Sequence, residues 1–161
     1  MCVQANETPS MKYNSLKVAA LIAKICKQNA LFYNNTKIQK LLYCCYGCAL
    51  ADLDGRICDE YPRAWQHGPV FPRVFKHISK GGEIILIDHS EITGQPAELI
   101  EEVTKSFGIY TATSLSEWTH SPNSPWDIVV NQTPADEGGG LGNFIPDDMI
   151  KDYFGRHVVQ K

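Results

Sequence analysis

The stretch TKIQKLLYCCYGCALA, residues 36–51, decides the fold of this 161-residue chain. Apolar residues recur in it at the spacing of a single helix face, namely Ile38, Leu41, Leu42, Cys45 and Ala49. Lys37 and Lys40 lie off this stripe. The spacing predicts an amphipathic helix that packs one face against a core.

A second helix is predicted just upstream, over residues 16–26. Only Lys17 and Lys24 interrupt its apolar residues. We therefore expect it to be buried on most sides and to lie near the centre of the fold. Asn14 or Ser15 supplies its N-terminal cap, and residues 34–36 provide a turn and the cap of the following helix.

Shorter elements are predicted downstream. Strands are expected over residues 57–66, where Pro62 weakens the pattern, and over residues 83–88, where four apolar residues follow one another. Helices are expected from Pro69 to residue 79, over 96–107, 115–119 and 126–131, and from about 145 to 155, with a mobile loop over the glycine-rich residues 133–143. The fold class is therefore α+β, a mostly helical single domain with two or three short strands. Residues 1–13 are predicted to form a flexible N-terminus and residues 14–157 the domain.

The composition is that of an ordinary globular protein, with 43% hydrophobic and 20% charged residues and a net charge of −3. The first fifty residues hold six lysines and one acidic residue, a net charge of +5, whereas the rest of the chain carries −8. The overall charge makes a nucleic-acid partner unlikely. The lysine-rich first part nevertheless motivates one alternative, a DNA-binding regulator of its own operon.

Several features point to a cytoplasmic protein without a membrane partner. No apolar run approaches the length of about 20 residues that a membrane span needs, and the first residues lack the pattern of a secretory signal. Six cysteines are present, and three of them, Cys44, Cys45 and Cys48, crowd into one helical stretch. Structural zinc needs four converging ligands, and no second ligand pair follows downstream. We expect thiols packed as small apolar side chains, no metal and no cofactor.

Catalytic motifs are absent from the sequence. The five histidines belong to no nucleophile elbow and no zinc-protease motif, and residues 138–142 lack the lysine of a phosphate-binding loop. We therefore expect a protein that is not an enzyme. A hydrolase that uses a cysteine and a histidine remains the less favoured alternative.

Two clusters combine an indole, an imidazole and a rigid turn. The first contains Trp65, Gln66, His67, Gly68 and Pro69, and the second contains Trp118, His120 and Trp126. Rigid aromatic turns can bind a partner at a low entropic cost. The same residues can instead pack in the core, with the histidines satisfying backbone groups. Both interpretations stay open, and these eight residues are the candidate partner-binding site.

The order and spacing of several motifs resemble the Panacea-domain family, also known as the phage-associated GepA-like or SocA-like antitoxins. The resemblance rests on KIQKLLY at residues 37–43 with Gly47, then Trp65, residues 68–70 and Pro72, then His120, residues 125–126 and the closing stretch 145–154. It spans about residues 16–154. Cys44 and Cys48 depart from it, because larger and often aromatic residues are expected there, and the loop at 138–142 resembles an extension.

The resemblance implies an antitoxin that neutralises a cognate protein toxin. Members of the family mostly act by binding their toxins directly, and one branch delivers its toxin to a protease. A protease or a chaperone is therefore a further partner that the resemblance allows. The identity of the toxin does not follow from the sequence.

Overall fold

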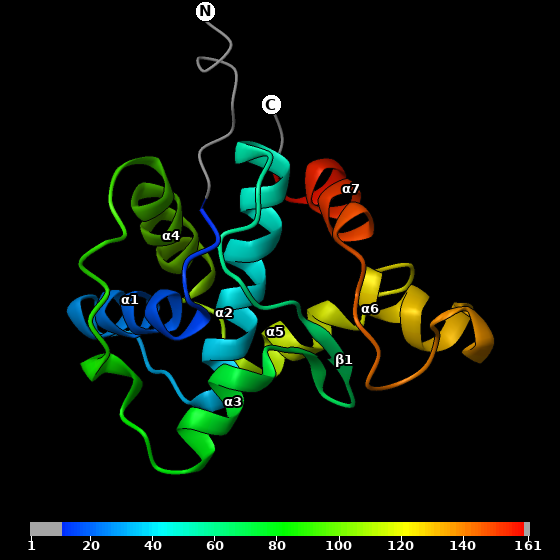
Figure 1. Cartoon of the computed structure of the whole chain (residues 1–161), viewed down its shortest axis with the longest axis horizontal. Helices are drawn as coiled ribbons and strands as arrows, with labels where there is room; N and C mark the ends of the chain where they lie inside the picture. Colours follow the sequence, from blue (N-terminus) through cyan, green and yellow to red (C-terminus); the bar gives the residue numbers. More distant parts are fainter. Residues whose placement is uncertain (1–10, 160–161) are drawn as a thin grey trace, which may run out of the picture.

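The computed structural model describes residues 11–159, which form a mostly helical domain with one two-stranded antiparallel sheet (Figure 1). The α-helices are α1 (Ser15–Gln28), α2 (Asn35–Cys48), α3 (Pro72–Ser79), α4 (Gly94–Phe107), α5 (Ala112–Thr119), α6 (Pro125–Asp127) and α7 (Asp147–His157). Shorter helical turns are η2 (Ala49–Leu53), η3 (Ile84–Leu86), η4 (Ile128–Gln132) and η5 (Ala135–Glu137). The strands are β1 (Arg63–Trp65) and β2 (Gly68–Val70). The predicted fold class is confirmed.

The central helix is α2, not α1. Figure 1 shows α2 passing through the middle of the molecule, and it contacts α1, α3, α4, α5, α7 and β2. Every residue from Lys37 to Cys48 is buried, so the apolar stripe marks only one of its packed faces. Small side chains on its other faces, among them Cys44, Gly47 and Cys48, let neighbouring helices approach closely.

Gly47 shows how tightly α7 packs on α2. A Cβ atom added at Gly47 would lie 2.4 Å from ring carbons of Phe154, a fully buried residue of α7. The Phe154 ring also meets Tyr43 edge to face at 5.4 Å between centroids. A glycine inside this helix is therefore explained by the aromatic side chain that lies against it.

The predicted caps of α1 and α2 are found, whereas the cap of α5 is a residue that was not predicted. The side chain of Asn14 accepts a hydrogen bond from the Leu16 amide at 2.8 Å, and Asn34 accepts one from Lys37 at 2.9 Å. At α5 the cap is Thr111, whose hydroxyl accepts from the Ser114 amide at 3.0 Å. These side chains satisfy amides that the first turn of a helix leaves without partners.

The two predicted strands are largely absent. Residues 57–66 contribute only β1 and two isolated bridges, one between Cys58 and Tyr13 and one between Arg63 and Phe144. Residues 69–70, predicted to begin a helix, belong to β2 instead, and α3 begins at Pro72. Residues 84–86 form the 3-10 turn η3 against α1, since within residues 11–159 no strand pairs with them.

The glycine-rich segment has fixed backbone partners. The Gly140 amide donates to Val129, and the Gly142 amide donates to Ala64 at 2.7 Å. The Ala64 amide in turn donates to the Asn143 carbonyl at 2.8 Å. The end of this loop therefore runs beside β1 and covers that edge of the hairpin.

The N-terminal prediction falls mostly outside the described residues. Of the segment 1–13, residues 1–10 are not described, whereas the Lys12 and Tyr13 amides donate to carbonyls of Arg56 and Ile57 at 3.0 Å. None of the helices within residues 11–159 combines the length and the apolar character that crossing a membrane requires.

Candidate functional site

The β1–β2 hairpin brings the first cluster of predicted residues together at a two-residue turn. Trp65 pairs with Gly68 across the antiparallel strands, so Gln66 and His67 form the turn, and both are exposed. Gly68 has a φ of +115°, which favours glycine. A Cβ atom there would also lie 2.7 Å from the Thr119 hydroxyl, so the turn needs glycine for two reasons.

Two polar side chains of α2 form hydrogen bonds with the backbone at and just after β2. The ammonium group of Lys40 donates to the Pro69 carbonyl at 3.0 Å, and the Gln39 side-chain oxygen accepts from the Phe71 amide at 2.7 Å. Both side chains are about 1% exposed. Burial lowers the pKa of Lys40 from its ordinary value of 10.5 to about 8.

Two residues of the second predicted cluster, His120 and Trp126, contact backbone carbonyls of the hairpin. The indole N–H of Trp126 donates to the Trp65 carbonyl at 2.7 Å. His120 follows α5 and lies against Trp126 with the two rings tilted by 59°, and 3.9 Å separates the ring centroids. One ring nitrogen of His120 lies 3.0 Å from the Gln66 carbonyl, which belongs to the turn itself. The two clusters therefore form one unit around the hairpin.

The two ring nitrogens of His120 both face carbonyl oxygens. Nε2 faces Gln66, and Nδ1 lies 2.6 Å from the Ser116 carbonyl. Of the two interpretations of this histidine, the structure supports a ring that satisfies backbone groups.

A pocket lies on each side of the turn. One of about 460 Å³ is lined by Thr36, Gln39, Lys40, Trp65, Gln66, His67, Val70, Phe75, Leu141 and Gly142. The other, of about 560 Å³, is lined by Asn34, Thr36, Gln66, His67, Ala112, Thr113, Ser116, Glu117 and His120. Thr36, Gln66 and His67 line both pockets, and the two exposed turn residues, Gln66 and His67, form the ridge that the pockets share.

The tryptophans differ in their surroundings. Trp126 is buried, and Trp65 is half-buried with its ring edge to face on Phe75 at 5.1 Å. Trp118 packs instead on Phe107 and on Phe154, with ring centroids 6.0 and 5.9 Å away. The structure therefore joins seven of the eight predicted residues and places Trp118 in the aromatic packing against α4 and α7.

The cysteine cluster is packed in the core, as predicted. Cys44 and Cys45 are fully buried, and burial raises their pKa well above the usual range for a thiol. Burial raises the pKa of Cys48 to about 12. Within residues 11–159, no group of three or more histidine, cysteine or acidic side chains is arranged to hold a metal ion.

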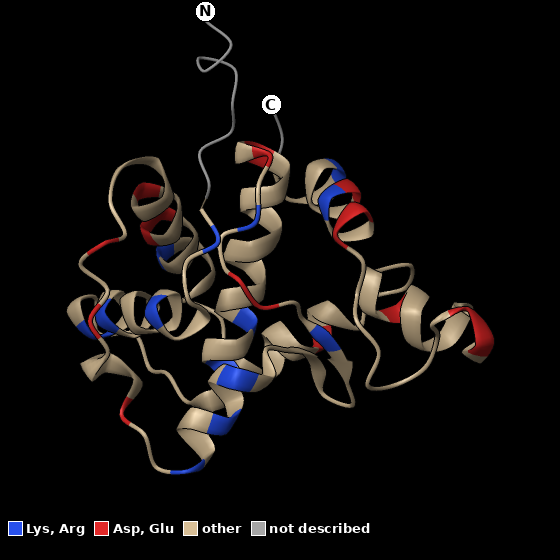
Figure 2. Cartoon of the chain, viewed as in Figure 1, with Lys and Arg blue, Asp and Glu red and all other residues tan. Residues whose placement is uncertain are grey.

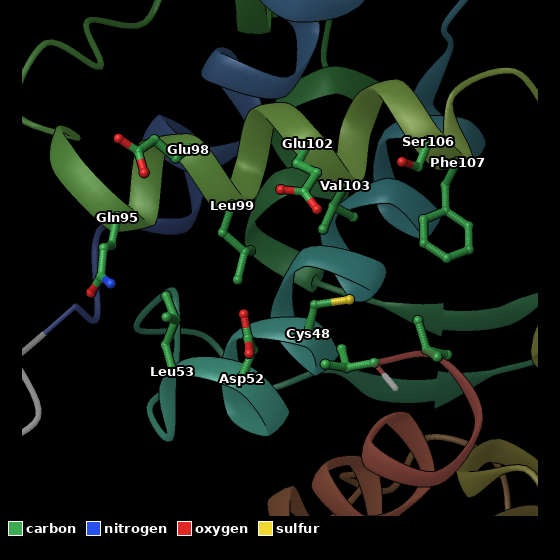
Figure 3. Close-up of a pocket in the computed structure, with 12 residues that line it drawn as sticks. Cys48, Asp52, Leu53, Gln95, Glu98, Leu99, Glu102, Val103, Ser106 and Phe107 are labelled. Atoms are coloured by element: carbon green, nitrogen blue, oxygen red, sulfur yellow. The ribbon is translucent and has the colours of Figure 1, made fainter. Parts of the chain in front are cut away.

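Cys48 lines a pocket of about 500 Å³ between α4 and the end of α2 (Figure 3). Glu98 and Glu102 extend from α4 and Asp52 from η2 into the same region. No histidine is among the residues that line it. The thiol therefore lacks, within this pocket, the histidine that a cysteine–histidine hydrolase needs, so that alternative gains no support here.

The charges are separated along the fold (Figure 2). Basic residues gather on α1, the first half of α2 and α3, whereas α4 is predominantly acidic. Two of the lysines, Lys37 and Lys40, are buried, and α2 exposes no polar face that could enter a DNA groove. The DNA-binding alternative therefore gains no support from α2.

Sequence reasoning missed Gln39 and Lys40 as parts of the site. Both lie off the apolar stripe of α2, where solvent exposure is the usual outcome. Their burial depends on the hairpin, whose contact with α2 is not visible in the local sequence. The only indication was their position inside the KIQKLLY stretch on which the family resemblance rests.

Comparison with known proteins gives a consistent picture. The family model described as "Antitoxin SocA-like, Panacea domain" matches residues 38–127, a range that contains all eight candidate residues. "Antitoxin SocA" of Caulobacter vibrioides (strain NA1000 / CB15N) is 31% identical over 136 residues, which cover 75% of this chain and 71% of the relative. No solved structure matches the chain.

Proposed function

Because the chain belongs to the SocA-like antitoxin family with a Panacea domain, we propose that it neutralises a cognate protein toxin by binding it directly. The docking surface is the Gln66–His67 turn, the two pockets beside it and the adjoining His120. Trp126 lies beneath this surface, and Trp65 forms part of the wall of one of the pockets.

The observation that carries the proposal is an exposed turn whose flanking backbone is fixed by hydrogen bonds. Gln66 and His67 are open to solvent, yet the backbone on either side of them is bonded to Trp126, His120 and Lys40. A preorganised surface loses little conformational entropy on binding. A ridge between two hollows also offers the shape complementarity that a specific interface needs.

Neutralisation by occlusion needs no cofactor and no bond-making step. A toxin bound with nanomolar affinity has a binding free energy of about −12 kcal/mol, so a modest excess of antitoxin keeps free toxin scarce. The protein thus acts as a binding protein and not as an enzyme. Its cytoplasmic location stays a prediction.

A second route is delivery of the toxin to a protease. The family resemblance allows it, and a chaperone could take part in the same way. Direct occlusion leaves the level of toxin in the cell unchanged, whereas delivery to a protease lowers it. Immunoblots of tagged toxin with and without this protein separate the two routes.

Co-expression tests the proposal. The reading frame beside the gene for this chain is expressed alone and together with the chain, and growth is followed. We expect growth arrest by the neighbour alone and rescue by co-expression, with a complex of the two proteins recovered by size-exclusion chromatography. A toxic neighbour that this protein neither rescues nor binds contradicts the proposal.

A further inference from the structure

Lys40 is a buried cation without a counter-charge. Its side chain is about 1% exposed, and within residues 11–159 no carboxylate forms an ion pair with it. Its ammonium group has three N–H donors, and the Pro69 carbonyl accepts one of them. Among the described residues, no second acceptor bonds to it. Burial of an unpaired ammonium is costly, so such groups are normally paired.

The same lysine lines the 460 Å³ pocket beside the hairpin turn. Apolar side chains, among them Trp65, Val70 and Phe75, form much of the wall. Gln66 and His67 stand exposed at its edge and carry further hydrogen-bond donors. The pocket therefore combines a buried positive charge, an apolar wall and a polar rim.

We propose that this pocket receives the side chain of a glutamate or aspartate of the bound toxin, which pairs with Lys40. The inference rests on the proposed function, because it names the chemistry by which the partner is held. The carboxylate accepts hydrogen bonds from the two N–H groups of Lys40 that are not bonded to the Pro69 carbonyl. Its methylene stem lies against the apolar wall, and Gln66 and His67 at the rim donate hydrogen bonds to its second oxygen.

The chemistry favours an acidic side chain over other partners. A single ammonium matches the single negative charge of one carboxylate, and charge-assisted hydrogen bonds are the stronger ones. Desolvation has already occurred on the lysine side, because Lys40 is buried in the free protein. The pair thus forms at a buried ammonium group, where electrostatic interactions are less screened than at the open surface.

The first test uses small probes and the unmodified chain. ¹H–¹⁵N NMR spectra are recorded with sodium propionate, with its neutral analogue propionamide, and with N-acetylglycine as a mimic of a chain terminus. We expect propionate to shift the amide signals of Gly68 and Phe71 and propionamide to leave them in place. Equal responses to propionate and propionamide, or a stronger response to N-acetylglycine, overturn the proposal.

The second test compares two buried lysines of the same helix. Lys37 is 4% exposed and donates to the Gly108 carbonyl at 2.5 Å, in the turn between α4 and α5. Lys37→Met therefore removes a buried ammonium from α2 without touching the pocket wall, and Lys40→Met removes the one in the pocket. We expect Lys40→Met to weaken toxin binding about 30-fold or more and Lys37→Met to leave it within a few-fold.

A scan of the toxin identifies the paired acid. One Glu→Gln or Asp→Asn change should weaken binding to the unmodified chain and add nothing to Lys40→Met, the signature of a direct pair. Thermal unfolding of both lysine variants shows that they are folded. If the unmodified chain fails to bind the toxin, the proposed function fails. If it binds and Lys40→Met binds equally well, only this inference fails.

Discussion

The central helix α2 meets two neighbours in opposite ways. Towards α7 the contact is apolar and close, with Gly47 leaving room for the ring of Phe154. Towards the hairpin the contact is polar, because Lys40 bonds to the backbone of β2 and Gln39 to the Phe71 amide just after it. Apolar burial dominates stability, whereas hydrogen bonds to backbone groups fix position. The comparison teaches that one side of α2 holds the fold and the other places the candidate site.

The largest effect should come from the apolar side. Phe154→Ala removes a fully buried ring and should lower the free energy of unfolding by about 3–5 kcal/mol. Phe32, which is 70% exposed, provides the matched control, since Phe32→Ala should change stability by about 0.5 kcal/mol or less. Urea denaturation measures both. Similar losses for the two variants would break the comparison.

The polar side of α2 should make the free energy of unfolding depend on pH, because Lys40 is buried there. The lowered pKa of Lys40 means that between about pH 8 and 10.5 the unfolded chain binds more protons than the folded one. Stability therefore rises with pH across this window, by about 3 kcal/mol for this group. Lys40→Met lacks the group, so the stability difference between it and the unmodified chain should change by that amount between pH 7 and 10.5. A constant difference would show that burial does not perturb the ammonium.

Gly47→Ala tests how closely α7 packs on the apolar side of α2. The added methyl group lies 2.4 Å from the Phe154 ring, and overpacking of this kind costs about 1–3 kcal/mol. Gly155 in α7 has open space around its Cα, so Gly155→Ala should stabilise the protein by up to about 1 kcal/mol through helix propensity. Opposite signs in thermal unfolding are expected. A stabilising Gly47→Ala would show that Phe154 can move aside.

Trp126→Phe isolates one polar bond. It keeps a buried aromatic ring but removes the N–H that donates to the Trp65 carbonyl, at a cost of about 1–2 kcal/mol. Trp118→Phe serves as its control, because within residues 11–159 the Trp118 indole N–H forms no hydrogen bond and its ring packs on Phe107. Denaturation curves should rank Trp126→Phe as the more damaging change. The reverse ranking would mean that the indole bond does not hold the hairpin.

The smallest effect on stability belongs to the turn itself. Gln66→Ala and His67→Ala should each change the free energy of unfolding by about 0.5 kcal/mol or less, because both side chains are exposed. Both should nevertheless weaken rescue from the toxin in co-expression. Leu86→Ala, at a residue 73% exposed on η3, should leave rescue intact. Full rescue by both turn variants would place the interface elsewhere.

Local patterns predicted most of the helices. The stripe of α2 and the caps at Asn14 and Asn34 are formed by residues close in sequence, so the sequence alone reveals them. The strand predicted over residues 83–88 failed because β propensity needs a partner strand, and α1 takes that place. The hairpin was missed because Gly68 and Pro69 also suit the start of a helix.

The site was predicted in pieces. Both clusters were found from their composition, but their union depends on contacts between residues more than fifty positions apart, such as Trp126 with Trp65. Trp118 resembles the other tryptophans in sequence and differs only in which neighbours surround it. Burial of Lys40 follows from the docking of the hairpin on α2, which no periodicity describes.

The hairpin has no edge left on which to accept another strand. On the β1 side the Ala64 amide and carbonyl are bonded to Asn143 and Gly142. On the β2 side the Pro69 carbonyl and the Phe71 amide are taken by Lys40 and Gln39. A toxin therefore cannot dock here by extending the sheet, and two copies of this chain cannot join edge to edge at this point. A partner that binds at this hairpin must therefore contact its side chains and fit the shape of its surface.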